Sequence, residues 1–277
     1  HLVFTREGYG KVLAEYTGFF SRDALAGFGF RWLHIVVGIV WIGLLYFFNF
    51  VQVPAYALFE AEPHKEIGGK ARLIALDTVT RRALWWFRWA ALATFLTGIF
   101  IVGLSKDYFK GPGDVSGMKL PGNVGILVGM LIGTIMFVNV WGIIWRNQKV
   151  VLANAANVLA GGQPDPAAAA AGRKALMASR QNTIFSISLL YFMVYRAHAA
   201  PFYATQLSSG KLAAFWIITL VLIVVLELNA LGMMPWKTEA NKGLNVIYDG
   251  PGARNFLVAG FGLWAIFLLI TEVLFKA

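Results

Sequence analysis

Six runs of apolar residues, each close to the length that crosses a bilayer, organise the chain. A transmembrane helix needs about 20 predominantly apolar residues, and polar residues, glycine or proline separate one run from the next. The pattern therefore predicts an all-α, polytopic transmembrane helix bundle with six spans. The predicted spans are Arg31–Pro54, Ala83–Leu104, Asn123–Trp145, Asn182–Gln206, Leu212–Met234 and Asn255–Phe275.

The segments between the runs complete the predicted organisation. Residues 1–30 mix charged and aromatic side chains and predict an interfacial helix lying on the membrane. Residues 59–82 and 236–254 are expected to be polar loops. Residues 146–181 predict a cytoplasmic helical hairpin, two helices parted by GGQPD, with Asp165 as N-cap and Pro166 at the first helical position. The expected domains are thus 1–30 and a six-span domain over 31–277, with 146–181 as its insert.

Composition and charge support a membrane protein. Of the 277 residues, 58% are hydrophobic and only 14% are charged, which leaves little polar surface for a soluble globule of this size. The formal net charge is +10, but the basic residues lie in short loops, so we expect the lipid membrane rather than nucleic acid as their partner. Thirteen basic residues follow the first, third and fifth spans, against nine on the other side. The positive-inside bias then predicts that the loops with thirteen basic residues are cytoplasmic and that both termini face outward.

Two histidines within the predicted spans are candidate haem ligands. The chain has no cysteine, which excludes a covalently attached c-type haem within these residues. His34 is expected about 5 Å and His198 about 10 Å inside the outer boundary, at 1.5 Å per residue. Imidazoles on facing helices at one depth can hold a six-coordinate b-type haem, with Arg31 and Arg196 at its propionates. The alternative is that the two histidines are independent helix-packing groups.

Further polar residues lie inside the predicted spans. Because hydrocarbon offers no hydrogen-bond partner, they must face protein and are candidate functional groups; they are Asn49, Gln52, Arg88, Asn139, Glu227 and Asn229. Asn49 and Gln52 share a helical stripe with His34. Arg88 and Glu227 both lie toward the inner side, so we expect a buried ion pair between them. Glycines at four-residue spacing from Gly125 to Gly133 form a ridge for a helix or a flat cofactor.

Several long blocks resemble the membrane domain of the bacterial membrane-bound urate oxidases. They are RWLHIVVGIVWIGLLYFFNFVQVPA, ALWWFRWAALATFLTGI, NVWGIIWRNQKVVLANA, GGQPDPAAAAAGRKALMASRQNTIFSISLLYFM and ELNAL, which together cover most of residues 30–232. The resemblance implies a multi-pass inner-membrane domain followed by a periplasmic c-type cytochrome domain that receives electrons from urate. No CxxCH motif occurs, so we expect the cytochrome to be a separate protein or to lie outside these residues.

One departure from the family pattern concerns the predicted haem region. Where the family is expected to have Asn-His followed closely by an aromatic residue and proline, this chain has Arg196-Ala197-His198-Ala199-Ala200-Pro201. Two functions therefore stay open. The first is a redox domain that passes electrons from a urate-like substrate to a periplasmic c-type cytochrome. The second is a non-catalytic membrane subunit that anchors a cytochrome within a respiratory or photosynthetic electron-transfer complex.

Overall fold

The computed structural model describes residues 21, 24–61, 63–105, 107–113, 116–203, 206–250 and 252–276, and the regular elements within them are all helices. The α-helices are α3 (Phe30–Tyr46), α4 (Val53–Ala61), α5 (Lys65–Ala75), α6 (Arg81–Leu104), α7 (Pro121–Val138), α8 (Trp145–Leu159), α9 (Ala168–His198), α10 (Ser209–Ala230) and α11 (Arg254–Leu274). The π-helical turns are η2 (Leu25–Gly29), η3 (Phe47–Gln52), η4 (Leu76–Thr80) and η6 (Asn139–Ile144). Short 3₁₀ turns are η5 (Gly117–Lys119), η7 (Ala200–Phe202) and η8 (Gly243–Ile247).

Five helical segments of the described chain are long and apolar enough to cross a membrane. They are Gly27–Ala61, Glu66–Leu104, Pro121–Leu159, Ser209–Ala230 and Arg254–Leu274. The first three are continuous helices in which α-helical stretches are joined by π-turns. The predicted all-α membrane bundle is therefore confirmed for these five segments.

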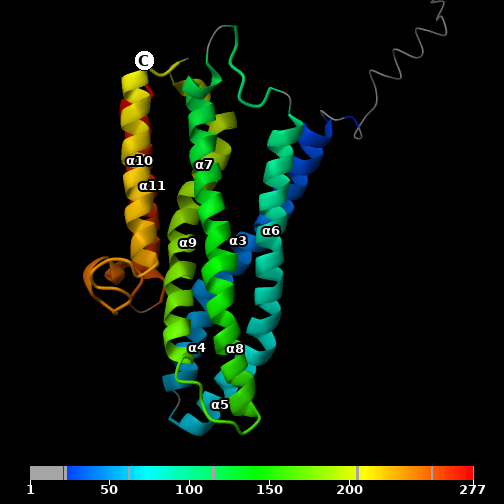
Figure 1. The fold of residues 1–277 in the computed structure, drawn as a ribbon, viewed down its shortest axis with the longest axis vertical. Coiled ribbons are helices and arrows are strands. Elements are labelled where there is room, and N and C mark those ends of the chain that lie inside the picture. Colours follow the sequence, from blue (N-terminus) through cyan, green and yellow to red (C-terminus); the bar gives the residue numbers. More distant parts are fainter. Residues whose placement is uncertain are drawn as a thin grey trace, which may run out of the picture.

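Helix α9, the remaining predicted span, lies at the centre of the bundle. It packs against α7, α8 and α11 and also contacts α3 and α10 (Figure 1). Neighbouring helices cover it so completely that residues 180–186 are all buried, although most of them are polar. A helix surrounded by protein need not be apolar, because its polar groups can bond to its neighbours. Its sequence is thus less apolar than a lipid-facing span, and six membrane crossings stay a prediction.

The lengths of the helices indicate which part of the bundle lies in the membrane. Helices α10 and α11 have 22 and 21 residues, or about 32 Å each, which matches a hydrocarbon core of about 30 Å. The two segments that end at Leu104 and Leu159 have 39 residues each, or about 58 Å. They continue past the connection between α10 and α11, and this projecting part, which we call the foot, consists of α4, α5, α8 and residues 168–181 (Figure 1).

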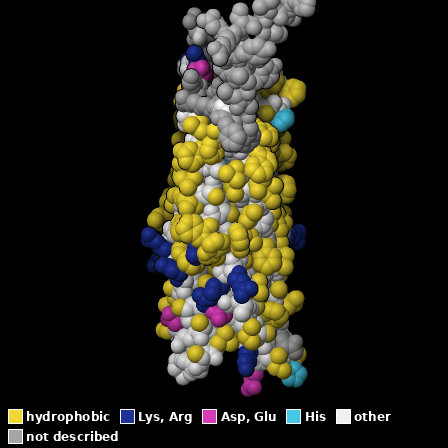
Figure 2. Space-filling model, turned by 90° about the vertical axis from the view of Figure 1, so that its right-hand side faces the viewer, with side chains coloured by type: hydrophobic (Ala, Val, Ile, Leu, Met, Phe, Trp, Pro, Cys, Tyr) yellow, Lys and Arg dark blue, Asp and Glu magenta, His cyan; other side chains and the backbone are white. Residues whose placement is uncertain are grey.

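The surface of the bundle changes character along its length. On the face shown in Figure 2, hydrophobic side chains cover the upper part, and Lys and Arg side chains gather below them, toward the foot. Helices α3 and α10 begin, and α11 ends, at the end of the bundle opposite the foot (Figure 1). The start of α3 and the end of α11 therefore lie on the same side of the bundle.

The segments outside the predicted spans differ from the expectations in two places. Residues 59–82 are not a polar loop: they form the end of α4, then α5 and η4, before α6 begins. Residues 146–181 do not form a separate hairpin: they belong to α8 and to the first part of α9, and both helices continue beyond this segment. Asp165 does not cap α9, because its Oδ1 accepts from the Ala167 N–H in a turn that precedes Ala168. The interfacial helix at 1–30 falls mainly outside the described residues.

The glycine ridge of α7 packs against α9. The backbone of Gly125 lies against the ring of Tyr195, so that an added Cβ would come 2.5 Å from Tyr195 Cδ1. A Cβ added at Gly129 would lie nearest to atoms of Phe192 and Met193, and a Cβ added at Gly133 would lie nearest to Leu189 Cδ1, at 3.5 Å. The ridge therefore serves helix packing, the first of its two predicted uses.

Candidate functional site

Buried polar side chains form a layer around the middle of α9, where two π-turns face it. A π-turn inserts one extra residue into an α-helix, which widens the helix locally and is frequent at functional sites. Asn49 lies in η3 and Asn139 lies in η6, and both are at most 1% exposed. Each amide reaches a polar side chain of α9, as the following contacts show.

The η3 side of the layer contains Asn49 and Gln52. Asn49 Nδ2 donates to the Leu45 carbonyl at 2.9 Å and to Ser179 Oγ at 2.8 Å. Gln52 Oε1 accepts from Thr80 Oγ1 at 2.9 Å, which joins η3 to η4. Trp41 and Leu45 are buried on the same stripe, so the predicted polar face of this helix does point into protein.

The η6 side of the layer contains Asn139, Asn182 and Glu227. Asn139 Nδ2 donates to Asn182 Oδ1 at 3.0 Å and to Glu227 Oε2 at 3.2 Å. Asn182 Nδ2 donates to the Met136 carbonyl at 3.0 Å. Three elements, η6, α9 and α10, therefore meet through one pair of amides and one carboxylate.

The connection between α10 and α11 closes the layer on the foot side. The Tyr248 hydroxyl donates to Gln181 Oε1 at 2.5 Å, and Trp236 Nε1 donates to Asn229 Oδ1 at 2.7 Å. Burial raises the pKa of the Tyr248 hydroxyl, a hydrogen bond with Asn229 lowers it and the nearby Glu227 raises it again, so that it stays above its ordinary value. Tyr248 therefore remains a protonated hydrogen-bond donor at neutral pH.

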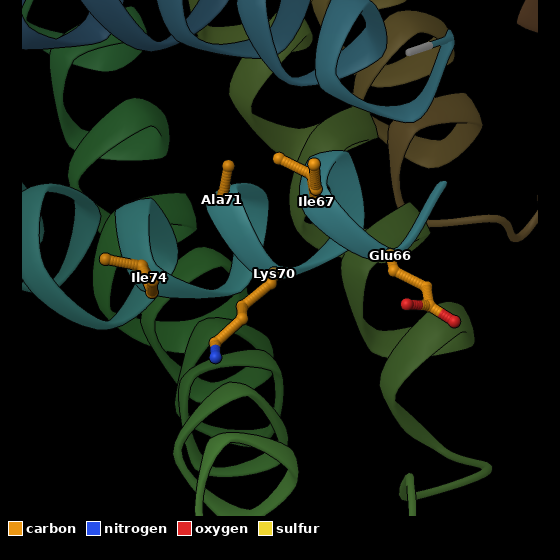
Figure 3. A pocket seen from close by; sticks show the side chains of 5 residues that line it. All are labelled: Glu66, Ile67, Lys70, Ala71 and Ile74. Carbon is orange, nitrogen blue, oxygen red and sulfur yellow. The ribbon is translucent and has the colours of Figure 1, made fainter. Parts of the chain in front are cut away.

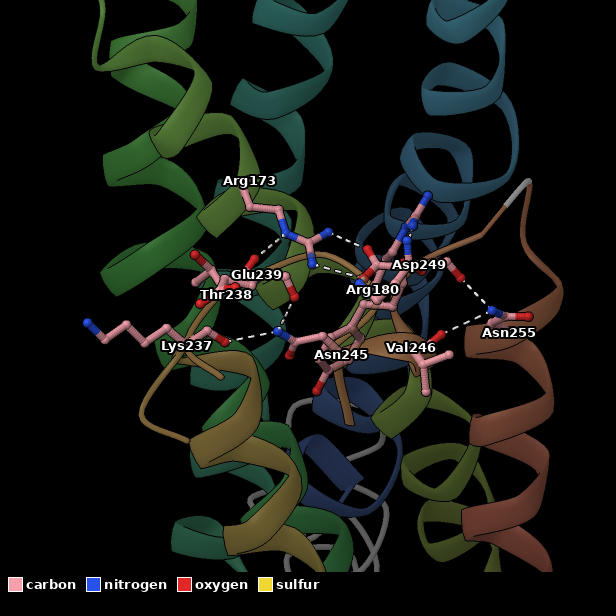
Figure 4. A network of polar contacts seen from close by, with 11 residues as sticks. Arg173, Arg180, Lys237, Thr238, Glu239, Asn245, Val246, Asp249 and Asn255 are labelled. Atoms are coloured by element: carbon pink, nitrogen blue, oxygen red, sulfur yellow. Dashed lines mark hydrogen bonds and ion pairs between the residues drawn. The ribbon is translucent and has the colours of Figure 1, made fainter. Parts of the chain in front are cut away.

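An ion pair fixes the same connection to the foot. Arg173 of α9 binds Asp249 bidentately, at 2.5 and 3.1 Å, and donates from Nε to the Thr238 carbonyl (Figure 4). The next arginine along the helix, Arg180, donates to the Tyr248 carbonyl. Burial raises the pKa of Asp249. The hydrogen bonds from Arg173 and from the Asn241 N–H, together with the charges of Arg173 and Arg180, lower the pKa by more than burial raises it, so the pKa lies below its usual value.

The predicted ion pair between Arg88 and Glu227 is not formed. The Arg88 guanidinium lies over the Trp145 ring, 3.8 Å from its centroid, and Glu227 accepts from Asn139. Among the described residues no ion pair joins the two. Residues at one depth in a bundle can face different neighbours, and depth alone does not fix the direction in which a side chain points.

The four residues predicted to hold a haem have different surroundings. His34 is half-buried, its Nδ1 lies 3.0 Å from Thr97 Oγ1, and its ring contacts Gly98, so it faces α6. Arg31 and His198 are exposed, and the His198 side chain makes no hydrogen bond with the described residues. Arg196 donates to the Tyr108 carbonyl at 2.6 Å, and its guanidinium lies 4.2 Å from the centre of the Tyr108 ring.

These surroundings fit one haem ligand only. A ligating histidine usually holds its second nitrogen in a hydrogen bond, as His34 does with Thr97. The contacts of the described residues do not bring His198 or Arg196 to His34. The haem stays a prediction. No group of three or more His, Cys, Asp or Glu side chains placed to hold a metal occurs in the described ranges.

Two surface hollows are less suited to chemistry than the buried layer. One is lined only by side chains of α5, namely Glu66, Ile67, Lys70, Ala71 and Ile74 (Figure 3). The other lies between α3, α9 and α11 and is lined by Tyr46, Tyr191, Trp264 and aliphatic or aromatic neighbours. Both hollows are open on the surface of the protein, and apart from Glu66 and Lys70 their linings offer only tyrosine hydroxyls and the Trp264 indole as polar groups.

The fold and this layer define a helical membrane protein with a buried polar centre. The family model described as "Urate oxidase N-terminal" matches residues 122–241, from α7 to the connection after α10. This part of the chain is therefore similar to the N-terminal region of that family. Comparison with curated proteins and comparison with solved structures each gave no match.

Several members of the layer were not anticipated from the sequence. They are Asn182, Gln181 and Tyr248, and the nearby ion pair between Arg173 and Asp249 was not anticipated either. A signal was available in the run Arg180-Gln181-Asn182-Thr183, four polar residues that precede an apolar stretch in one continuous helix. No sequence pattern connects Asp249 to Arg173, which lies 76 positions earlier.

Proposed function

We propose that this chain contributes the membrane-embedded redox domain of a urate-oxidase-like protein. In this proposal a urate-like substrate is oxidised, and its electrons pass to a c-type cytochrome on the outer side of a bacterial inner membrane. Both termini then face the periplasm, and the basic foot faces the cytoplasm, in agreement with the positive-inside bias.

One observation carries the proposal: the family match and the buried polar layer coincide. Residues 122–241 include Asn139, Gln181, Asn182, Glu227 and Asn229. Amide side chains provide both donors and acceptors, and a carboxyl group can bind and release a proton, the groups needed near an oxidation that releases protons. His34 and Asn49 lie outside the matched residues.

The second candidate function is a membrane subunit that anchors a cytochrome within a larger electron-transfer complex. The contacts of the amides favour it in one respect. Asn139 bonds to Asn182, Asn182 bonds to the Met136 carbonyl and Asn49 bonds to Ser179, as polar side chains do when their role is to join helices.

Membranes that contain the complete natural protein distinguish the two functions. Right-side-out vesicles supplied with urate and oxidised cytochrome c are expected to reduce the cytochrome. Asn139→Leu, which removes the bonds to Asn182 and Glu227, should lower this rate at least about tenfold, the effect expected when a positioned polar group is lost. The matched control is Val138→Leu, because Val138 is the preceding residue and is 55% exposed.

The outcomes separate the functions clearly. A well-assembled protein that copurifies with a cytochrome but gives no urate-dependent reduction would refute the enzyme and support the anchor. The haem is tested separately on the purified protein, where a reduced-minus-oxidised b-type spectrum should disappear in both His34→Ala and His198→Ala. A folded protein without such a spectrum would refute the predicted haem.

A further inference from the structure

Glu227 is a carboxylate that faces the interior of the bundle. It continues the inward stripe of α10 formed by Phe215, Thr219 and Ile223, each of which is at most 1% exposed and lies four residues from the next. Residues at this spacing share one face of a helix. Val224 and Val225, on the other faces, are exposed. Glu227 is itself only partly buried, but its carboxylate points toward η6, where it meets Asn139.

The hydrogen-bond donor that reaches Glu227 is neutral. Asn139 Nδ2 lies 3.2 Å from Oε2 and is shared with Asn182. One shared amide hydrogen bond stabilises an ionised carboxylate far less than a cation or several N–H groups would. The contact favours the ionised form only weakly and is also possible with a neutral carboxylic acid, whose carbonyl oxygen can accept from Asn139.

The charged groups on the surrounding elements have other partners. Arg88 of α6 lies over Trp145, Arg180 of α9 donates to the Tyr248 carbonyl, and Arg173 binds Asp249. Arg146 at the start of α8 and Arg254 at the start of α11 are exposed. Two tyrosine hydroxyls lie beside the layer: that of Tyr248 donates to Gln181 and lies 3.2 Å from the Leu226 carbonyl, and that of Tyr46 bonds to Ser186. Within the described chain, Glu227 thus forms no ion pair.

We propose that Glu227 is a proton-binding site at the inner boundary of the membrane, which holds its proton as a neutral carboxylic acid and exchanges it with the cytoplasmic side. An ionised carboxylate without an ion pair is costly in an apolar bundle, and the group avoids this cost by taking up a proton. Glu227 lies three residues before the end of α10, or about 4.5 Å along the helix, so water at the foot is close. In the exchange one O–H bond forms on the carboxylate as a hydronium ion gives up its proton, and no electron moves.

Dicyclohexylcarbodiimide tests this site, because this apolar reagent adds to protonated carboxylic acids in apolar surroundings. Native membrane vesicles are treated over a series of pH values that spans neutrality, and the labelled positions are read by peptide mass spectrometry. Glu227 should be labelled at and below neutral pH, with labelling falling as the pH rises. Glu60 and Glu272 are internal controls, because they form ion pairs with Arg72 at 2.6 Å and Lys276 at 2.7 Å and should stay unlabelled.

Two variants sharpen the test. Glu227→Gln keeps the shape and can still accept from Asn139, so it should fold normally and lose the label. Asn139→Leu removes a hydrogen bond that favours the ionised form of Glu227, so labelling should extend to higher pH. Loss of an ordinary hydrogen bond corresponds to about a fivefold change in the protonation equilibrium of Glu227.

Three results would overturn the proposal. They are absence of label on Glu227 in folded protein at every pH, labelling that does not depend on pH, and protection by Na⁺ at constant pH, which would assign a metal cation instead. The measurement needs neither urate nor a cytochrome, so its outcome is independent of the proposed redox function.

Discussion

A methyl group added at Gly125 tests how closely α7 and α9 pack. The new Cβ would lie 2.5 Å from Tyr195 Cδ1, 3.1 Å from Cε1 and 3.2 Å from Cγ, all closer than ordinary contact. The ring cannot easily move away, because Tyr195 is fully buried and packs against Tyr203, with ring centroids 5.7 Å apart, and against Phe275. Gly125→Ala must therefore push α7 and α9 apart.

The expected magnitude follows from two opposing effects. Overpacking a well-packed core costs about 1–3 kcal/mol, and replacing glycine by alanine within a helix gains up to about 1 kcal/mol. We expect a net loss of about 1–2 kcal/mol for Gly125→Ala. Gly133→Ala is the matched control, since its Cβ would meet Leu189 Cδ1 at an ordinary 3.5 Å and the variant should be as stable as the parent or more so.

The assay is thermal unfolding of the purified protein in detergent. For a chain of this size 1 kcal/mol shifts the midpoint by roughly 2–4 °C, so the two variants should differ by about 5–10 °C. Gly129→Ala should fall between them, because its Cβ would lie 3.3 Å from Phe192 Cβ and 3.4 Å from the flexible end of Met193. Equal midpoints for the Gly125 and Gly133 variants would refute the close packing of Tyr195 on α7.

The apolar helices were predictable from hydropathy, whereas the continuity of α9 from 168 to 198 and the polar helix α5 were not. The last two spans were expected at 212–234 and 255–275 and are found at Ser209–Ala230 and Arg254–Leu274. Helix α9 begins at Ala168, before its apolar part, because neighbouring helices and not lipid surround it. Helix α5 was missed because its composition is polar, although Ile67, Ala71 and Ile74 recur at helical spacing.

The members of the polar layer were partly predictable, but their partners were not. Asn49, Asn139 and Glu227 were recognised because polar groups are rare in membrane spans. That they face protein was expected, but their partners could not be deduced, since the π-turns at 47–52 and 139–144 shift the phase of each helix relative to a regular 3.6-residue repeat. Asn139 consequently reaches α9 and α10, and the expected partner of Glu227 was wrong.

Three further predictions follow from the charged residues. The pKa of Asp249 is lower in the folded than in the unfolded protein. The ionised carboxylate therefore stabilises the fold at pH values above the unfolded-state pKa, and this stabilisation is lost as the pH falls through the folded-state pKa. Asp249→Asn should lower the free energy of unfolding by about 1–3 kcal/mol at neutral pH, and the difference in thermal midpoint from the parent protein should shrink below about pH 4. In sealed right-side-out vesicles residues 146–181 should be protected from added protease, and cleavage from outside would reverse the proposed orientation. Finally, Arg88→Gln and Glu227→Gln should act independently on the free energy of unfolding. The Arg88 guanidinium lies on Trp145 and Glu227 accepts from Asn139, so neither substitution removes a partner of the other residue. The double variant should equal the sum of the single effects within about 0.5 kcal/mol, and a coupling clearly above this value would show that the two side chains meet after all.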